Sequence, residues 1–213
     1  MDNMKEFTPE QSLEIIARSI EESRERMLKN AGQPLIRWGV LVLATSLAVS
    51  ALWYFTGSPL WTLLYFLMAI VGFTQEHFMG KKRESVPVGF VGKTIDYVWT
   101  TFAIFAMSFP LLLSLFFGFL VFFPPHSGPI SIDVPITGFI ALVMGFSTTI
   151  SGFVLKNKWI IAGGIMSGLG GLIADHFIAG GFEILIIAVI AIVGLIIPGL
   201  MVNLENRKSC SSR

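Results

Sequence analysis

Long apolar stretches dominate this chain of 213 residues, and they constrain its fold more than any other feature. A helix needs about 20 mostly apolar residues to cross a membrane. The region from Leu35 to Leu204 has room for about six such helices and little else. Charged residues make up only 14% of the chain, whereas an ordinary soluble domain has about 25%. We therefore expect an integral membrane protein without a sizeable soluble domain.

Turn-forming segments separate the apolar stretches and predict an all-α membrane protein with six transmembrane helices. The predicted spans are residues 35–56, 59–79, 95–123, 134–155, 159–178 and 182–203. The chain is therefore expected to comprise an amphipathic helix within residues 1–34, a transmembrane domain at 35–203 and a polar tail at 204–213. Pro198 is expected to bend the sixth span near its end.

The basic residues predict how these spans are oriented. All 15 precede the first span or lie at its entry, lie between the second and third or the fourth and fifth, or follow the sixth. They are Lys5, Arg18, Arg24, Arg26, Lys29, Arg37, Lys81, Lys82, Arg83, Lys93, Lys156, Lys158, Arg207, Lys208 and Arg213. Because cytoplasmic loops are enriched in Lys and Arg, this distribution predicts that both termini lie in the cytoplasm.

Three tryptophans recur at equivalent places in the predicted topology. Trp38, Trp99 and Trp159 each lie near the cytoplasmic end of an outward-going span. Three helical hairpins in series would give this repetition. Tryptophan also marks membrane interfaces in general, and this explanation without a repeat is the favoured alternative.

The segment before the first span has the pattern of an amphipathic helix. Thr8-Pro9-Glu10-Gln11 has the form of a capped helix start. We expect a helix from Pro9 to Lys29, ended by the segment Asn30-Ala31-Gly32-Gln33-Pro34. One face of it is an apolar seam of Leu13, Ile16, Ile20 and Met27.

That seam must be buried by something other than its own helix. The possibilities are a membrane surface, a second copy of the chain or a cytoplasmic protein. Its polar face mixes Glu and Arg, which disfavours attraction to anionic lipid and favours a contact between proteins.

Polar residues near the outer ends of the spans form a candidate ion or proton site. Asp175 and His176 lie about one turn from the end of the fifth span, and His126 and Asp133 lie in or beside an outer loop. Ionisable residues in a membrane are costly, so each is a functional candidate. Asp175 continues the helix face of Gly164, Gly168 and Gly171, which predicts that it points toward a neighbouring helix. A buried structural carboxylate is the alternative, and no metal site is predicted.

Three charged residues near the cytoplasmic interface are candidates for structural ion pairs. Arg37 lies at the start of the first span, Glu76 at the end of the second and Asp96 at the start of the third. Pairing of Arg37 with either carboxylate would hold neighbouring helices together. Snorkelling of these side chains to the lipid headgroups is the alternative.

Small residues predict which helices pack most closely. Gly164, Gly168 and Gly171 lie along one face of the fifth span, and Gly145 and Gly152 belong to a small-residue stripe in the fourth. Such stripes allow two helix backbones to approach each other in a membrane. We therefore expect the fourth and fifth spans to form the tightest pair.

Catalytic chemistry has no signature in this sequence. It contains no Walker loop, GxSxG, HExxH or CxxC motif, so an enzyme is not expected and no cofactor is implied. The single cysteine, Cys210, cannot form an intrachain disulfide. A net charge of +1 without a basic arm gives no reason to expect nucleic acid as a partner.

The N-terminal region resembles a loose group of small uncharacterised bacterial six-pass membrane proteins. The resemblance rests on Gln11-Ser12-Leu13, Ile15-Ile16 and Trp38-Gly39, and it covers about the first 40 residues. It implies a location in the bacterial inner membrane and a small winged-helix regulator as one possible partner. From the residues themselves we expect a binding, regulatory or scaffold role through the N-terminal helix, with membrane lipid around the spans. The alternative is a small transporter or channel for a cation or proton that uses Asp175.

Overall fold

The structure is a computed structural model that describes residues 8–81, 90–122, 136–178 and 182–211. Every element in these ranges is a helix. The elements are α1 (Pro9–Thr56), η1 (Pro59–Leu63), α2 (Leu64–Lys81), α3 (Phe90–Phe122), α4 (Ile136–Leu155), α5 (Lys158–Phe177), α6 (Glu183–Ala191), η3 (Ile192–Ile196) and α7 (Ile197–Ser211). The all-helical fold class is as the sequence predicts.

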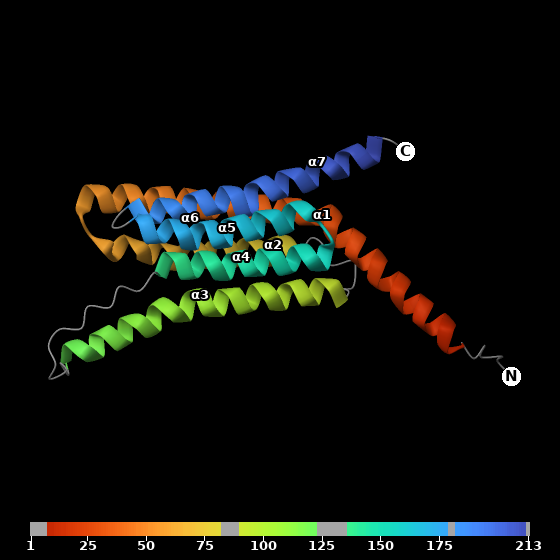
Figure 1. Ribbon diagram of the computed structural model, residues 1–213, viewed down its shortest axis with the longest axis horizontal. Coiled ribbons are helices and arrows are strands. Elements are labelled where there is room, and N and C mark those ends of the chain that lie inside the picture. The colour runs from red at the N-terminus through yellow and green to blue at the C-terminus, as the bar shows by residue number, and fades with distance from the viewer. Residues whose placement is uncertain (1–7, 82–89, 123–135, 179–181, 212–213) are drawn as a thin grey trace.

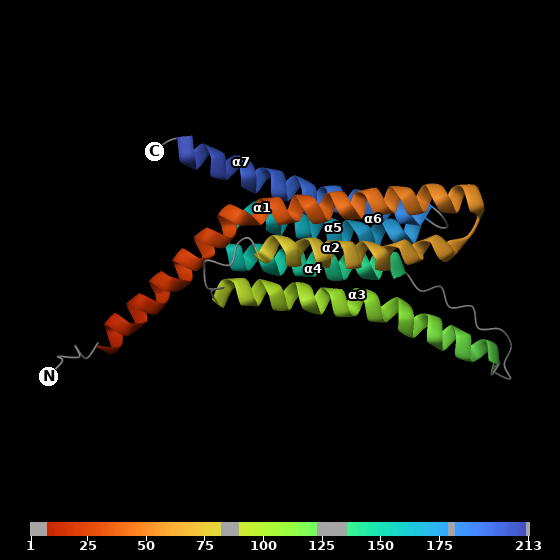
Figure 2. The same cartoon turned by 180° about the vertical axis from the view of Figure 1, so that it is seen from behind.

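The helices lie side by side in one bundle (Figures 1 and 2). The chain reverses direction between each of α1 to α5 and the next of these helices and again between α5 and α6, whereas α6, η3 and α7 continue in one direction. The end of α2, the start of α3, the turn between α4 and α5 and the end of α7 therefore lie at one end of the bundle, which we call the basic end. The first part of α1 leaves the bundle at the same end. This alternation brings the described basic residues to one end, as the count along the chain predicts.

Five helical segments are long and apolar enough to cross a membrane. They are Ala31–Thr56, Phe90–Phe116, Ile136–Leu155, Lys158–Phe177 and Glu183–Asn206. The expected second span corresponds to a shorter apolar segment, Leu60–Glu76, which begins as the 3-10 helix η1 and continues as α2. The arrangement in three hairpins stays a hypothesis.

The expected break after the N-terminal helix is wrong, because α1 runs without interruption from Pro9 to Thr56. Its start is as predicted: the Gln11 N–H donates to the Thr8 hydroxyl at 3.3 Å, and the Thr8 N–H donates to the Gln11 side chain at 3.2 Å. Pro34 lies within the helix. A proline lacks one N–H and crowds the preceding turn, but a helix can continue through it when packing holds both sides.

Packing against α7 explains why Gly32 does not end the helix. A Cβ on Gly32 would lie 2.7 Å from the carbonyl oxygen of Gly199 and would also meet the Asn203 side chain. A Cβ on Gly199 would in turn lie 2.9 Å from the Gly32 carbonyl oxygen. The two glycines therefore mark a close crossing of α1 and α7, and Gly32 is a packing residue instead of a helix terminator.

The sixth predicted span accommodates Pro198 through the π-helix η3. The Ile197 N–H donates to the carbonyl of Ile192, one residue further back than in an α-helix. In a regular α-helix the Pro198 ring would crowd the carbonyl of Gly194. The wider π turn directly before the proline relieves this crowding, and Pro198 is fully buried in the bundle.

Candidate functional site

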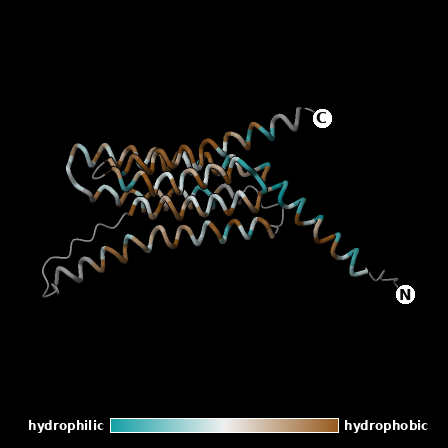
Figure 3. The backbone as a smooth tube through the Cα atoms, in the orientation of Figure 1, coloured by the Kyte–Doolittle hydropathy of each residue, from teal (hydrophilic) through white to brown (hydrophobic). Residues whose placement is uncertain are grey.

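The part of α1 that precedes the bundle is the most prominent candidate for an interaction site. Residues 9–29, which we call the projecting segment, precede the bundle, and the segment extends away from the other helices toward its N-terminal end (Figures 1 and 2). Hydrophilic residues are concentrated there, with a few hydrophobic residues between them, whereas the bundle is mostly hydrophobic (Figure 3). Leu13, Ile16 and Ile20 of the expected seam are 68%, 55% and 41% exposed. Their burial therefore requires something outside the described chain.

The fourth residue of the expected seam has a different environment. Met27 packs against an apolar cluster of Val91, Leu155, Ile160 and Val202, which come from α3, α4, α5 and α7. The bundle itself therefore covers Met27, at the end of the projecting segment. The exposed seam comprises Leu13, Ile16 and Ile20 only.

Polar contacts also hold the base of the projecting segment to α7. The Asn206 side-chain amide donates to the carbonyl oxygens of Leu28 and Lys29 at 3.4 and 3.2 Å. Lys156, in the turn between α4 and α5, lies 3.9 Å from the carboxylate of Glu21. Two separate elements of the basic end thus contact residues 21–29.

The same end of the bundle contains a hydrogen-bonded group around Glu205. Its carboxylate accepts hydrogen bonds from the Asn157 amide at 3.2 Å and from the Trp159 indole at 2.8 Å. Asn157 also caps α5, because its side-chain oxygen accepts from the backbone N–H groups of Trp159 and Ile160. Analysis of the sequence missed this group, although an asparagine directly before a helix is a recognisable capping signal.

Asp175 points toward the start of α4, as its position on the glycine face of α5 predicts. A Cβ on Gly138 would lie 2.8 Å from one carboxylate oxygen of Asp175. Both oxygens are buried, and neither has a hydrogen-bond partner among the described residues. They lie beside the first turn of α4, whose N–H groups have no partner within the helix and give that end a partial positive charge. This position favours a carboxylate electrostatically.

The other members of the expected ion site do not join Asp175 within the described structure. His176 is exposed and makes an edge contact with the neighbouring Phe177 ring, at a centroid distance of 5.4 Å. His126 and Asp133 lie outside the described residues. Within the described ranges, no three His, Cys, Asp or Glu side chains converge as metal ligands would.

Glycines make α4 and α5 the most extensively packed pair among the described helices. A Cβ on Gly145 would lie 2.7 Å from both the Gly164 carbonyl oxygen and the Gly168 nitrogen, and one on Gly152 would lie 2.7 Å from the Ile161 nitrogen. Gly171 lies against Ala141 and Ile190 in the same way. The five glycines singled out from the sequence therefore lie where helices approach most closely.

Polar contacts within the bundle join α1 to α2. Arg37 forms an ion pair with Glu76 at 2.8 Å, which is one of the two pairings expected from the sequence. Asp96 lies near the start of α3, at the same end of the bundle. A second contact was not expected: the Tyr65 hydroxyl donates to the Ser46 hydroxyl at 2.8 Å. These contacts hold α2 against α1.

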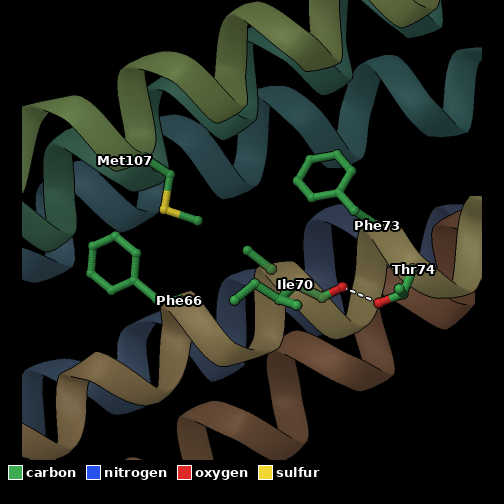
Figure 4. A pocket seen from close by; sticks show the side chains of 6 residues that line it. Phe66, Ile70, Phe73, Thr74 and Met107 are labelled. Carbon is green, nitrogen blue, oxygen red and sulfur yellow. Dashed lines mark hydrogen bonds between the residues drawn. The ribbon is translucent and has the colours of Figure 1, made fainter.

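An open groove of about 710 Å³ lies between α2 and α3 (Figure 4). It is lined by Phe66, Ala69, Ile70, Phe73, Thr74 and Met107. The only hydroxyl among these side chains, that of Thr74, donates to the Ile70 carbonyl within its own helix. The lining therefore suits lipid chains better than a polar solute.

Comparisons of this chain with protein-family models, with curated proteins and with solved structures found no match. The class of protein is therefore defined by the fold alone. It is a helical protein with five segments long and apolar enough to cross a membrane and a further helical segment that extends from one end of the bundle.

Proposed function

We propose that the chain is a bacterial inner-membrane protein with six spans and with both termini in the cytoplasm. The basic end of the bundle supports this orientation. A crossing by η1 and α2 is supported by their apolar segment Leu60–Glu76, whose length is about 28 Å at rises of about 2.0 and 1.5 Å per residue. The hydrocarbon core of a bilayer is about 30 Å thick. The contacts of Arg37 and Tyr65 hold these two elements against α1.

Within this arrangement, the function is to bind a protein through the projecting segment, in a regulatory or scaffold role. The observation that carries the proposal is the exposed seam of Leu13, Ile16 and Ile20 on a helix that continues directly into the bundle. Apolar side chains presented together outside a membrane mark a binding surface. The segment carries five Glu residues against four basic residues, so it is not a polybasic anchor for anionic lipid.

Contacts at the base of the projecting segment would transmit the effect of such binding to the bundle. A partner that moves residues 9–29 would displace the carbonyls held by Asn206 and the carboxylate near Lys156. Asn206 adjoins Glu205, which is bonded to both Asn157 and Trp159. Binding in the cytoplasm would therefore act on α7 and on the turn between α4 and α5.

Crosslinking in cells tests the binding role. A photoreactive residue at Leu13 is expected to trap a specific protein, and the double variant Ile16→Glu, Ile20→Glu is expected to lose that product while the chain still inserts in the membrane. Ile15→Glu is the matched control, because Ile15 is 53% exposed but points about 100° away from Ile16. Recovery of the same product from the double variant and the parent would reject the binding role.

A second candidate function is carried by the two buried oxygens of Asp175, which have no hydrogen-bond partner among the described residues. Ionisable side chains within a membrane are candidates for proton transfer or cation binding. In proteoliposomes, Asp175→Asn removes the charge while keeping the shape, so a transport role predicts loss of proton or cation flux at unchanged protein levels. Equal flux in variant and parent would leave Asp175 with a structural role beside α4.

A further inference from the structure

We propose that the projecting segment pairs with the same segment of a second copy of this chain, through Leu13, Ile16 and Ile20. This inference rests on the binding role proposed above and names the partner. A second copy is favoured over another protein or the lipid surface by three properties: the residues beside the seam, the charges on the rest of the segment and the geometry of insertion.

The residues on both sides of the seam are compatible with a symmetric pair. The spacing of the seam places Leu13 and Ile20 at a positions and Ile16 at a d position of a heptad. In a parallel pair, the flanking residue Ser12 would then face Ala17 of the second copy, and neither side chain is charged. Arg24, at the next flanking position, is mostly covered within its own chain and forms an ion pair with Glu21. No pair of like charges beside the seam therefore opposes self-association.

Acidic and basic residues nearly balance along the segment, which carries five Glu residues and four basic residues. Arg18 contacts Glu22 at 3.1 Å, and Arg24 forms an ion pair with Glu21. The segment therefore does not present an unneutralised patch that would select an acidic or a basic partner. What it offers to a partner is the apolar seam itself.

Insertion in one membrane orients two copies for this contact. Both copies have the same orientation, so their projecting segments leave the membrane at the same height. A two-fold axis along the membrane normal then brings each seam residue close to its own counterpart. Three exposed apolar side chains are a small interface for free helices in water. Confinement to a membrane raises the effective concentration and favours the pair without additional contacts.

Disulfide formation between single cysteines tests this pairing. Cys210 is the only cysteine, so Cys210→Ser provides a cysteine-free background. In it, Ile16→Cys or Ile15→Cys is introduced, and the purified full-length protein is oxidised in proteoliposomes at a low protein-to-lipid ratio. The two isoleucines are 55% and 53% exposed, which makes them a matched pair. Disulfides need Cα atoms about 4.4–6.8 Å apart, so Ile16→Cys is expected to form at least several-fold more covalent dimer than Ile15→Cys.

Equal dimer yields from the two variants, or no dimer from either, would overturn the pairing. The in-cell crosslink from Leu13 separates this failure from failure of the binding role. A product of higher mass that contains a different protein, together with no Ile16→Cys dimer, would reject the second copy and keep the binding role. Absence of both products would reject both proposals.

Discussion

A graded series of glycine variants tests how closely α4 and α5 are packed. A Cβ on Gly145 would lie 2.7 Å from two backbone atoms of α5, one on Gly168 would lie 3.1 Å from the Gly145 Cα, and one on Gly170 would have nothing within 4 Å. Nonbonded atoms pack best at about 3.5–4.0 Å, so Gly145→Ala would force the two backbones to move about 1 Å further apart. Backbone atoms on both sides leave no flexible side chain that could yield instead.

The expected order of stability follows from these distances. Gly145→Ala is expected to lower the free energy of unfolding by about 1–3 kcal/mol through overpacking. Gly168→Ala is expected to lose less, because a shift of a few tenths of an ångström accommodates the methyl group. Gly170→Ala meets no neighbour and is expected to gain up to about 1 kcal/mol from helix propensity.

Thermal unfolding of the purified protein in detergent measures this order. One kcal/mol corresponds to about 2–4 °C for a chain of this size, so the melting temperature of Gly145→Ala is expected to fall well below that of Gly170→Ala. The two variants make the same chemical change in adjacent helices of the bundle. Equal melting temperatures for Gly145→Ala and Gly170→Ala would show that the close contact is not formed.

Two further predictions concern the contacts of α1. Tyr65→Phe removes the hydrogen bond to Ser46 and is expected to lower the free energy of unfolding by about 0.6–1.7 kcal/mol. Tyr54→Phe is the control and is expected to have little effect, because Tyr54 is 76% exposed. Equal melting temperatures for the two variants would contradict the contact. Gly32→Ala is expected to lower the free energy of unfolding by about 1–3 kcal/mol, because the added methyl group crowds Gly199. An increase in melting temperature would instead indicate a loop at this position.

The apolar helices were predictable because hydropathy and length act locally. The stretches that become α3, α4 and α5 begin and end close to the predicted boundaries, since a membrane-spanning helix must satisfy its own backbone hydrogen bonds. The close approach of α4 and α5 was also predictable, because glycines at spacings of three and four residues share one helix face. The face toward which Asp175 points followed from the same spacing.

The features that could not be predicted from the sequence depend on contacts between segments far apart in the chain. Gly32 and Pro34 are typical of a helix end, and only the crossing with α7 shows why α1 continues through them. Glu205 lies 46 and 48 residues from the two side chains that donate to it. A local pattern gives no information on such a pairing. Met27 has the spacing of the seam, but its burial depends on four other helices.

Mapping the topology in living cells tests the central claim, that six spans place the basic end and the projecting segment in the cytoplasm. A reporter that is active only outside the cytoplasm would be fused after Ser58, His126 or Gly180, and after Arg83 or Asn157. The first three fusions are expected to be active and the last two inactive. An active reporter after Arg83, or an inactive one after Ser58, would contradict a crossing by α2 and with it the proposed arrangement.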